Sequence, residues 1–292
     1  MQTFLVRAHF GVGCFSDVQS PSLFKQVRFC IERTSIFDVP CSVFDIQFAS
    51  IPKNSYLPSM PSRKKITVLT GAGISAESGI PTFRDADGLW EGYDVMEVAT
   101  PEGWQQNPAL VLDFYNQRRK RALEVSPNRG HEILAELEAD FEVTIVTQNV
   151  DNLHERAGSS NVIHLHGSLF EARSCKNERL IYPIKGWELK LGDLCEEGSQ
   201  LRPNIVWFGE MVPLMATAAE HARRSDIFLV VGTSMAVYPA AGLIDYVPFE
   251  SPKYIIDPNI PEVAHIPYLH KFPEKASTGM EKLRKELLQY VL

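Results

Sequence analysis

The 292-residue sequence has few cysteines, no net positive charge and no long hydrophobic run, and each absence excludes a class of protein. Five cysteines without regular spacing argue against a disulfide framework and favour a reduced, cytoplasmic environment. The net charge of −7 argues against nucleic-acid binding through a basic face. The apolar runs are far shorter than the roughly 18 residues typical of a transmembrane helix. We therefore expect a soluble protein that binds neither nucleic acid nor membrane.

Residues 1–63 differ in composition from the rest of the chain. They contain eight of the sixteen phenylalanines but show no sustained helical or strand period. A signal peptide is not indicated, because the first residues lack a basic region followed by an apolar core. A transit peptide fits poorly, because acidic residues are spread through the segment. The sequence favours Met60 as the natural start of the protein, and a genuine accessory segment is the alternative.

The stretch from Lys65 to Arg84 carries a glycine-rich loop. The β-branched run 66–70 is typical of a buried strand, and it breaks into Gly71-Ala72-Gly73. Together with Ala76, these glycines match the spacing that lets a backbone with free N–H groups approach a pyrophosphate. Taken alone, the pattern is equally typical of tight strand-to-helix packing.

Two further buried strands are expected at 141–146 and 227–231, and both end in polar residues. Ligands of open parallel sheets bind at such strand ends. The alternative is that Asn and Asp only cap loops, as they commonly do. The polar residues and glycine at these ends are Gln148, Asn149, Asp151, Gly232, Thr233 and Ser234.

Residues 162–167 predict a strand with His164 and His166 on one face. An H-x-H strand can bind a metal ion, but no third ligand is nearby in the sequence. An imidazole titrates near neutral pH and can also serve as a general base.

A helix is predicted from Ala109 to Leu123, after an Asn-Pro pair suited to a helix start. Tyr115 and Arg118 are three residues apart on this helix, so both can point into one cavity and bind a carboxylate. The alternative is an ordinary solvent-facing helix edge. The basic run 118–121 is interpreted as a solvated face.

Five motifs occur in the same order as in the sirtuins, the NAD-dependent protein-lysine deacylases, and the chain resembles that family from Lys64 to about Leu292. The motifs are GAGISAESGIPTFR at 71–84, TQNVDNLH at 147–154, HLHG at 164–167, WFGE at 207–210 and GTSMAVYPAA at 232–241. The resemblance implies an α/β fold, with a Rossmann-like parallel sheet, helices on both faces and a small inserted domain at about 170–203. Residues 1–63 would be an extension outside this catalytic domain.

The resemblance also implies an NAD site, in which Asn149 and Asp151 hold the nicotinamide amide together with Ile80. His166 becomes the general base, and His164 a hydrogen-bonded core residue. The family usually has asparagine where Asp257 stands. The implied NAD contacts are Gly71, Ala72, Gly73, Ser75, Ile80, Phe83, Arg84, Gln148, Asn149, Asp151, Gly232, Thr233, Ser234, Asp257, Asn259 and Ala276.

The implied substrates are proteins with acylated lysines, and the substrate peptide lies as an added strand between two edges of the protein. In the bacterial and mitochondrial deacylase branch, a Tyr-x-x-Arg pair at the place of Tyr115 and Arg118 binds the carboxylate of succinyl- or malonyl-lysine. The implied edge residues are Val206, Phe208, Gly209, Glu210 and Val237.

The activity implied by the resemblance is removal of acetyl, succinyl or malonyl groups from lysine. The acyl oxygen attacks the ribose carbon as nicotinamide leaves, His166 activates a ribose hydroxyl, and the products are lysine, nicotinamide and O-acyl-ADP-ribose. Two alternatives remain: an NAD-dependent ADP-ribosyltransferase that uses the same pocket, and a non-catalytic sensor of NAD or ADP-ribose. The presence of His166 disfavours the sensor.

The sequence departs from the family pattern in the inserted domain. Most sirtuins have two Cys-x-x-Cys pairs there, which form a four-sulfur zinc site, but only Cys175 and Cys195 are present here. We therefore expect no zinc. A small hydrophobic cluster is expected to replace it, formed by Leu180, Ile181, Tyr182, Ile184, Trp187, Leu189, Leu191 and Leu194.

Two expectations concern the C-terminal part of the chain. Residues 254–259 are predicted to form the last strand and its turn. Thr278 and Glu281 match a capping box, which predicts the start of the closing helix.

Overall fold

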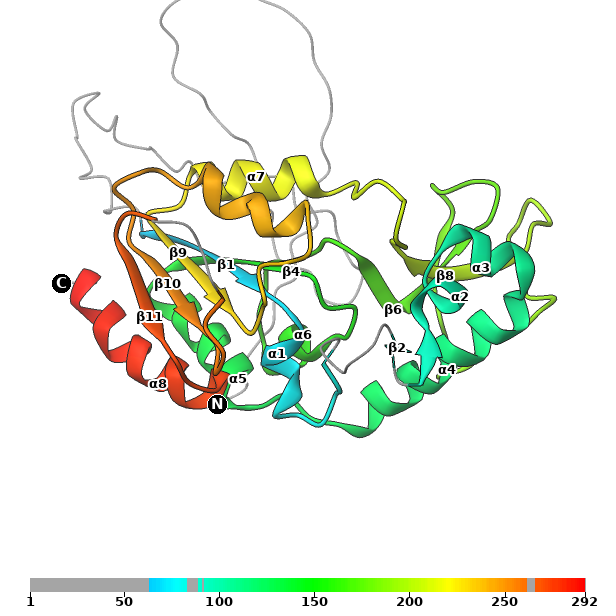
Figure 1. Ribbon diagram of the computed structural model, residues 1–292, viewed down its shortest axis with the longest axis horizontal. Coiled ribbons are helices and arrows are strands. Elements are labelled where there is room, and N and C mark those ends of the chain that lie inside the picture. Colours follow the sequence, from blue (N-terminus) through cyan, green and yellow to red (C-terminus); the bar gives the residue numbers. More distant parts are fainter. Residues whose placement is uncertain (1–62, 83–88, 91, 262–265, 292) are drawn as a thin grey trace, which may run out of the picture. The chain divides into compact units, whose positions relative to one another are not determined.

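The computed structural model describes residues 63–82, 89–90, 92–261 and 266–291 (Figure 1). The expectations for residues 1–62, and for Phe83 and Arg84, lie outside these ranges. The centre is a six-stranded parallel sheet in the order β11-β10-β9-β1-β4-β5. The strands are β1 (Lys65–Thr70), β4 (Glu142–Thr147), β5 (Val162–His164), β9 (Ile227–Val231), β10 (Lys253–Ile256) and β11 (Leu269–Phe272).

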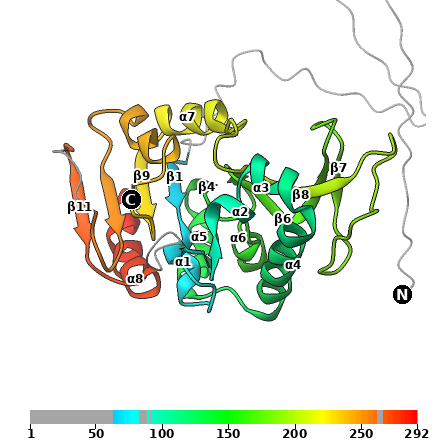
Figure 2. The same cartoon turned by 45° about the vertical axis from the view of Figure 1, so that its right-hand side comes forward.

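Helices cover both faces of this sheet, because its central strands are apolar on both sides. On one face, α5 (Arg129–Glu136) and α8 (Ala276–Leu287) pack on the side chains of Ile66, Val68 and Ile145. On the other face, α7 (Met215–Arg223) and the 3₁₀ helix η2 (Ala240–Tyr246) pack on Leu69, Val146 and Phe228. Figures 1 and 2 show α7 and α8 on opposite sides of the sheet, which confirms the expected fold class. Four shorter elements are α1 (Ala72–Ala76), α6 (Leu153–Ala157), η1 (Leu137–Ala139) and η3 (Leu288–Tyr290).

The C-terminal part differs from both sequence expectations. The strand β10 is not the last one, because β11 pairs beside it in parallel at the sheet edge. Its Leu-His-Lys-Phe sequence is mostly polar or exposed, so it gave no strand signal. The capping box is also wrong. Lys275 is the N-cap of α8, Thr278 Oγ1 donates to the Lys275 carbonyl, and Glu281 accepts from Arg129 Nε at 2.6 Å.

A smaller module combines an antiparallel sheet with three helices (Figure 2). Asn107 starts the longest of these helices by accepting from Leu110 N at 3.1 Å, as its Asn-Pro sequence predicts. Across the described residues of the chain, no helix is long and apolar enough to span a membrane. The elements of the small module are α2 (Val95–Val98), α3 (Pro101–Gln106), α4 (Pro108–Glu124), β6 (Gly167–Ser174), β7 (Ile181–Pro183), β8 (Leu201–Ile205) and the hairpin β2 (Leu89–Trp90) and β3 (Tyr93–Asp94).

The predicted hydrophobic cluster of the insert is largely wrong. Only Leu189 is buried, where it packs with Leu112 of α4 and Ala172 of β6, and Ile184 lies beside them. Most of the other apolar side chains reach solvent because the loops after β6 and β7 lie at the surface. The exposed ones are Ile181, Trp187, Leu191 and Leu194.

Polar side chains of α4 hold the insert instead. Arg119 is fully buried, and its guanidinium donates to the Leu169 carbonyl, to the Trp187 carbonyl at 2.7 Å and to Asn116 Oδ1 at 2.8 Å. Asn116 also bonds both the N–H and the carbonyl of Leu189, at 2.9 and 3.0 Å. Burial lowers the pKa of Arg119 to about 10, so it stays charged at neutral pH. The interpretation of the basic run as a solvated face is therefore wrong for Arg119.

Candidate active site

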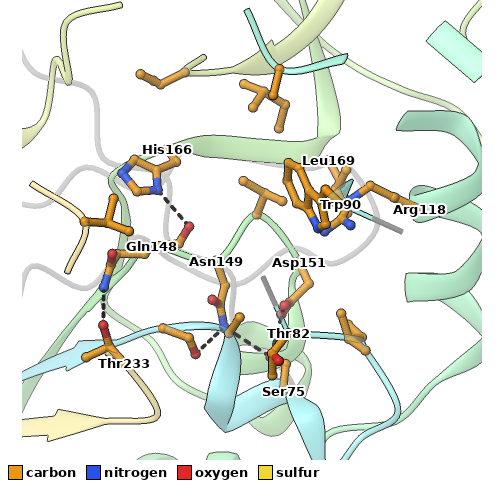
Figure 3. A pocket seen from close by; sticks show the side chains of 18 of the residues that line it. Ser75, Thr82, Trp90, Arg118, Gln148, Asn149, Asp151, His166, Leu169 and Thr233 are labelled. Carbon is orange, nitrogen blue, oxygen red and sulfur yellow. Dashed lines mark hydrogen bonds between the residues drawn. The ribbon is translucent and has the colours of Figure 1, made fainter. Parts of the chain in front are cut away.

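One cavity of about 290 Å³ opens at the carboxyl ends of β1, β4, β5 and β9 and extends to the small module (Figure 3). It brings together most of the residues expected from the sequence, although they come from segments far apart in the chain. Of the expected NAD contacts, those that line it are Gly71, Ala72, Gly73, Ser75, Ile80, Gln148, Asn149, Asp151, Gly232, Thr233 and Ser234. Of the expected substrate and catalytic residues, those that line it are Tyr115, Arg118, His166, Val206, Phe208, Gly209, Glu210 and Val237.

The glycines bring two loops into direct backbone contact beside the cavity. Gly71 N donates to the Val231 carbonyl at 3.1 Å, and Gly73 N donates to the Gly232 carbonyl at 2.8 Å. Gly232 has φ +65°, and a Cβ there would lie 2.2 Å from the nitrogen of Ile74. The packing interpretation therefore accounts for these glycines. The N–H groups of Gly71 and Gly73 both donate to backbone carbonyls at the end of β9, so these two groups hold the loops together.

A chain of hydrogen bonds links the carboxamide and the carboxylate at the end of β4. Asn149 Nδ2 donates to the Gly71 carbonyl and to Ser75 Oγ, both at 3.1 Å, and Ser75 Oγ donates to Asp151 Oδ2 at 3.0 Å (Figure 3). Asp151 Oδ1 accepts from Leu153 N at 3.1 Å, so the loop-capping interpretation holds for one of its two oxygens. Burial raises the pKa of Asp151, and these two hydrogen bonds oppose the rise. The pair thus places a carboxamide and a carboxyl group side by side in the wall of the cavity.

His166 is oriented by the strand end before it and the glycine after it. Its Nδ1 lies 3.0 Å from the Gln148 carbonyl, and Gln148 Nε2 donates to Thr233 Oγ1 at 3.1 Å. Because a carbonyl only accepts, Nδ1 carries the proton of the neutral ring and Nε2 is left as the base. Burial lowers the pKa of His166, and the hydrogen bond to Gln148 opposes this. Gly167 has φ +82°, and a Cβ there would lie 2.0 Å from the Asn204 carbonyl oxygen, so glycine is required after the histidine.

His164 does not line the cavity. Strand β5 ends at this residue, so the predicted strand to 167 is too long. Its Nδ1 is 2.9 Å from the Asn149 carbonyl and its Nε2 is 2.7 Å from Glu155 Oε1, which confirms the expected hydrogen-bonded role. Among the residues that the structure describes, no group of three or more His, Cys, Asp or Glu side chains is arranged to hold a metal ion.

Tyr115 and Arg118 lie at the end of the cavity formed by the small module. Tyr115 is fully buried, and its hydroxyl accepts from Trp207 Nε1 at 3.0 Å. Burial raises the Tyr115 pKa to about 12, opposed by the positive charge of Arg118. Arg118 is half-buried and its guanidinium carbon lies 4.0 Å from the ring centroid of Trp90. The alternative of a solvent-facing helix edge therefore does not describe this pair.

Unlike its neighbours on the expected peptide edge, Glu210 has a carboxylate that is bound by two arginines and a backbone N–H. Its carboxylate accepts from Arg173 at 3.0 Å, from Arg202 at 2.8 Å and from Trp207 N at 2.9 Å. Burial raises the pKa of Glu210, but the hydrogen bonds from Arg202 and Trp207 outweigh it and the net pKa is lowered. Glu210 thus fixes the turn from Trp207 to Glu210, in which its own N–H donates to the Trp207 carbonyl at 3.0 Å.

Three expected NAD contacts are not brought to the cavity, namely Asp257, Asn259 and Ala276. Asp257 Oδ1 accepts from Asn259 N at 2.8 Å in the turn after β10, and Ala276 is the first residue of α8 and packs in the core. The sequence interpretation also missed lining residues. Trp90 and Leu169 line the cavity but are not among the expected site residues, because no local spacing signals that they meet.

Comparisons with known proteins agree with this geometry. The model of the Sir2 family, the sirtuins, matches residues 71–239. The chain is 55% identical over 230 residues to an NAD-dependent protein deacylase of Bacteroides thetaiotaomicron, an alignment that covers 77% of this chain and 98% of the relative. The chain belongs to the Sir2 family. A second such relative, from Helicobacter pylori, is 52% identical over 77% of this chain and 98% of its own length.

Solved Sir2 structures share the fold. A Sir2 homologue in complex with NAD superimposes with a TM-score of 0.71 at 38% identity, covering 79% of this chain and 91% of that chain. A Sir2 protein with a p53 peptide and NAD⁺ gives a TM-score of 0.65 at 32% identity, covering 78% and 95%. The Sir2 fold thus accounts for both the parallel sheet and the small module.

Proposed function

We propose that this Sir2-family protein is an NAD-dependent deacylase of protein lysines. The observation that carries the proposal is His166, a half-buried imidazole with Nε2 as its basic nitrogen, in one cavity with Asn149 and Asp151. The curated relatives are named NAD-dependent protein deacylases, and a solved relative holds a peptide together with NAD⁺. Loss of acyl groups from a lysine peptide in step with NAD consumption tests the proposal.

The residues present fit NAD. Asn149 and Asp151 are more than nine-tenths buried and offer an amide and a carboxyl group, which complement the primary amide of nicotinamide. The close backbone packing of Gly71 and Gly73 against Gly232 places the residues of both loops along one wall of the cavity. When bound, NAD supplies an electrophilic ribose carbon and a leaving nicotinamide. Gln148 keeps Nε2 of His166 ready to accept a proton from a ribose hydroxyl.

Acylated lysine proteins are the proposed substrates, with succinyl and malonyl groups accepted as well as acetyl. The support is the pair Tyr115 and Arg118, which both line the cavity. Arg118 lies at the end of the cavity far from His166 (Figure 3). The positive Arg118 can bind an acyl carboxylate, and the Tyr115 hydroxyl has a hydrogen left to donate because it accepts from Trp207. The peptide backbone is proposed to pair along Val206 and Val237.

Replacing Arg118 with methionine is expected to separate the two kinds of substrate. A succinyl carboxylate that leaves water needs charge-assisted hydrogen bonds, each of about 1.5–3 kcal/mol, whereas an acetyl group needs none. The variant should lose roughly ten- to a hundredfold in kcat/KM for a succinyl peptide and change little for the acetyl peptide. The measurement uses one peptide with either acyl group at saturating NAD. An equal loss of kcat/KM for both peptides would show that Arg118 is a structural support. An unchanged kcat/KM for the succinyl peptide would contradict the proposed preference for acidic acyl groups.

We also propose that the small module folds without zinc and that the protein works in the reducing cytoplasm. Glu178 and Gly198 stand where Cys-x-x-Cys spacing would place the partners of Cys175 and Cys195. Cys195 Sγ instead contacts Ser174 Oγ and accepts from Ser199 N, both at 3.4 Å. The hydrogen bonds from Asn116 and Arg119 offer another way to hold the insert.

Elemental analysis of the purified protein is expected to find no stoichiometric zinc, and a strong chelator should leave the melting temperature and activity unchanged. A structural zinc contributes folding free energy directly, so its removal would otherwise be visible in a melt. Replacing both Cys175 and Cys195 with serine should also leave the melt nearly unchanged. About one zinc per chain, lost together with folding on chelation, would overturn the proposal.

A further inference from the structure

The guanidinium of Arg118 lies against two aromatic rings. Its central carbon is 4.0 Å from the ring centroid of Trp90 and 5.4 Å from that of Phe114. The two rings contact each other edge to face, with centroids 5.2 Å apart at 67°. Trp90 and Arg118 appear side by side at the end of the pocket distant from His166 (Figure 3).

The aromatic contacts join two separate elements. Phe114 and Arg118 are one turn apart on α4, whereas Trp90 belongs to the hairpin β2–β3. Tyr93, paired with Trp90 in that hairpin, also packs on Phe114 with centroids 5.3 Å apart. The hairpin continues into α2, whose first turn is capped by Asp94 through the Met96 N–H at 2.9 Å. The Trp90 ring is therefore held by the packing of the small module.

A stacked arginine keeps the edge of its guanidinium for hydrogen bonds, because the ring occupies only the flat face. The N–H groups point outward in the guanidinium plane, where a carboxylate binds with two parallel hydrogen bonds. A free arginine loses side-chain entropy when it binds a ligand, and an arginine already ordered by an aromatic face loses less. The attraction between a cation and a π face is also strongest where water is excluded.

We propose that Trp90 is a positioning residue that sets the preference for acidic acyl groups by holding Arg118 in its binding orientation. The inference rests on the proposed desuccinylation and adds to it a residue from outside the Tyr-x-x-Arg pair. Trp90 acts through Arg118, so it affects only substrates that bind the guanidinium. An acetyl group ends in a methyl and does not bind it.

Trp90→Leu is expected to raise KM for a succinyl peptide about tenfold, with kcat nearly unchanged and acetyl kinetics within about twofold. Tenfold corresponds to about 1.4 kcal/mol, a typical size for a partly desolvated cation–π contact. Trp90→Phe keeps an aromatic face and should recover most of the loss. Trp187→Leu is the matched control, because it removes an exposed aromatic ring that faces Lys120 of the same helix instead of Arg118, so both peptides should be affected equally.

A double variant decides whether Trp90 acts through Arg118. In Arg118→Met, the further change Trp90→Leu should cause no additional loss of succinyl activity, because the guanidinium is already gone. Additive losses, or equal losses for both acyl groups, would make Trp90 a plain wall of the cavity and overturn the inference alone. Absence of succinyl activity in the unaltered protein, or a succinyl rate unaffected by Arg118→Met, would instead overturn the proposed acyl preference and this inference with it.

Discussion

Replacing His166 with alanine is expected to lower deacylation by about 10²- to 10⁴-fold, the usual loss when a general base is removed. The imidazole lines the cavity and its Nδ1 is committed to the Gln148 carbonyl, so its Nε2 is the basic nitrogen. Alanine leaves Asn149, Asp151 and the glycine loops in place, so NAD binding should change little. The rate of deacylation in a single turnover measures the effect on catalysis, and calorimetry measures the effect on NAD affinity.

A variant of a remote histidine controls for general damage. His270 stacks on Tyr254 at the edge of the sheet, with ring centroids 4.9 Å apart, and does not line the cavity. His270→Ala should therefore keep its turnover. If His166→Ala turns over at a rate near that of the unaltered protein, His166 is not the base.

The pH dependence of kcat/KM gives a second readout of His166. Its pKa is lowered by burial, so the base is neutral at pH 7 and is lost only as pH falls through a value below 6.5. The acid limb of the profile should therefore have its midpoint below 6.5 and should be absent from the residual activity of His166→Ala.

Replacing Arg119 with methionine is expected to lower the free energy of unfolding by about 3 kcal/mol or more. The change keeps the length of the side chain but leaves the carbonyls of Leu169 and Trp187 without this donor. It also removes one of the two hydrogen bonds that Asn116 Oδ1 accepts. Each buried acceptor left unpaired costs roughly 1–3 kcal/mol. Chemical denaturation measures the change, and hydrogen exchange should show the loss of protection in β6 and in the segment around Trp187.

The adjacent Lys120 provides the control, because it is an exposed cation on the same helix. Lys120→Met should change stability by less than about 0.5 kcal/mol. Asn116→Leu should be less than additive with Arg119→Met, because the two side chains share a hydrogen bond. Unchanged stability and exchange in Arg119→Met would show that the insert is held by other contacts.

The sequence predicts the elements whose signals are local. The β-branched run of β1 ends at Gly71, the apolar runs of β4 and β9 end in polar residues, and Asn107 starts α4. Because the strands of the six-stranded sheet are parallel, their carboxyl ends meet at one edge of that sheet, so most of the candidate site follows from strand ends and motif order.

The features that the sequence does not predict depend on partners distant in the chain. Arg119 sits in a basic run typical of a solvated face, yet its carbonyl partners lie 50 and 68 residues away. The spacing of Thr278 and Glu281 fits a cap, but Glu281 binds Arg129, 152 residues earlier. Trp90 reaches Arg118 only because a short hairpin packs against α4. Local patterns contain no information on such contacts.

Mass spectrometry of the products tests the central claim most directly. The protein is incubated with NAD and a peptide that carries one acyl-lysine, and NAD, nicotinamide, peptide and acyl-ADP-ribose are quantified over time. We expect one nicotinamide and one O-acyl-ADP-ribose for each lysine set free, and no reaction without NAD. Transfer of ADP-ribose to the peptide, or release of nicotinamide without loss of the acyl group, would contradict deacylation. If both NAD and the acylated peptide stay intact, the protein is a non-catalytic sensor.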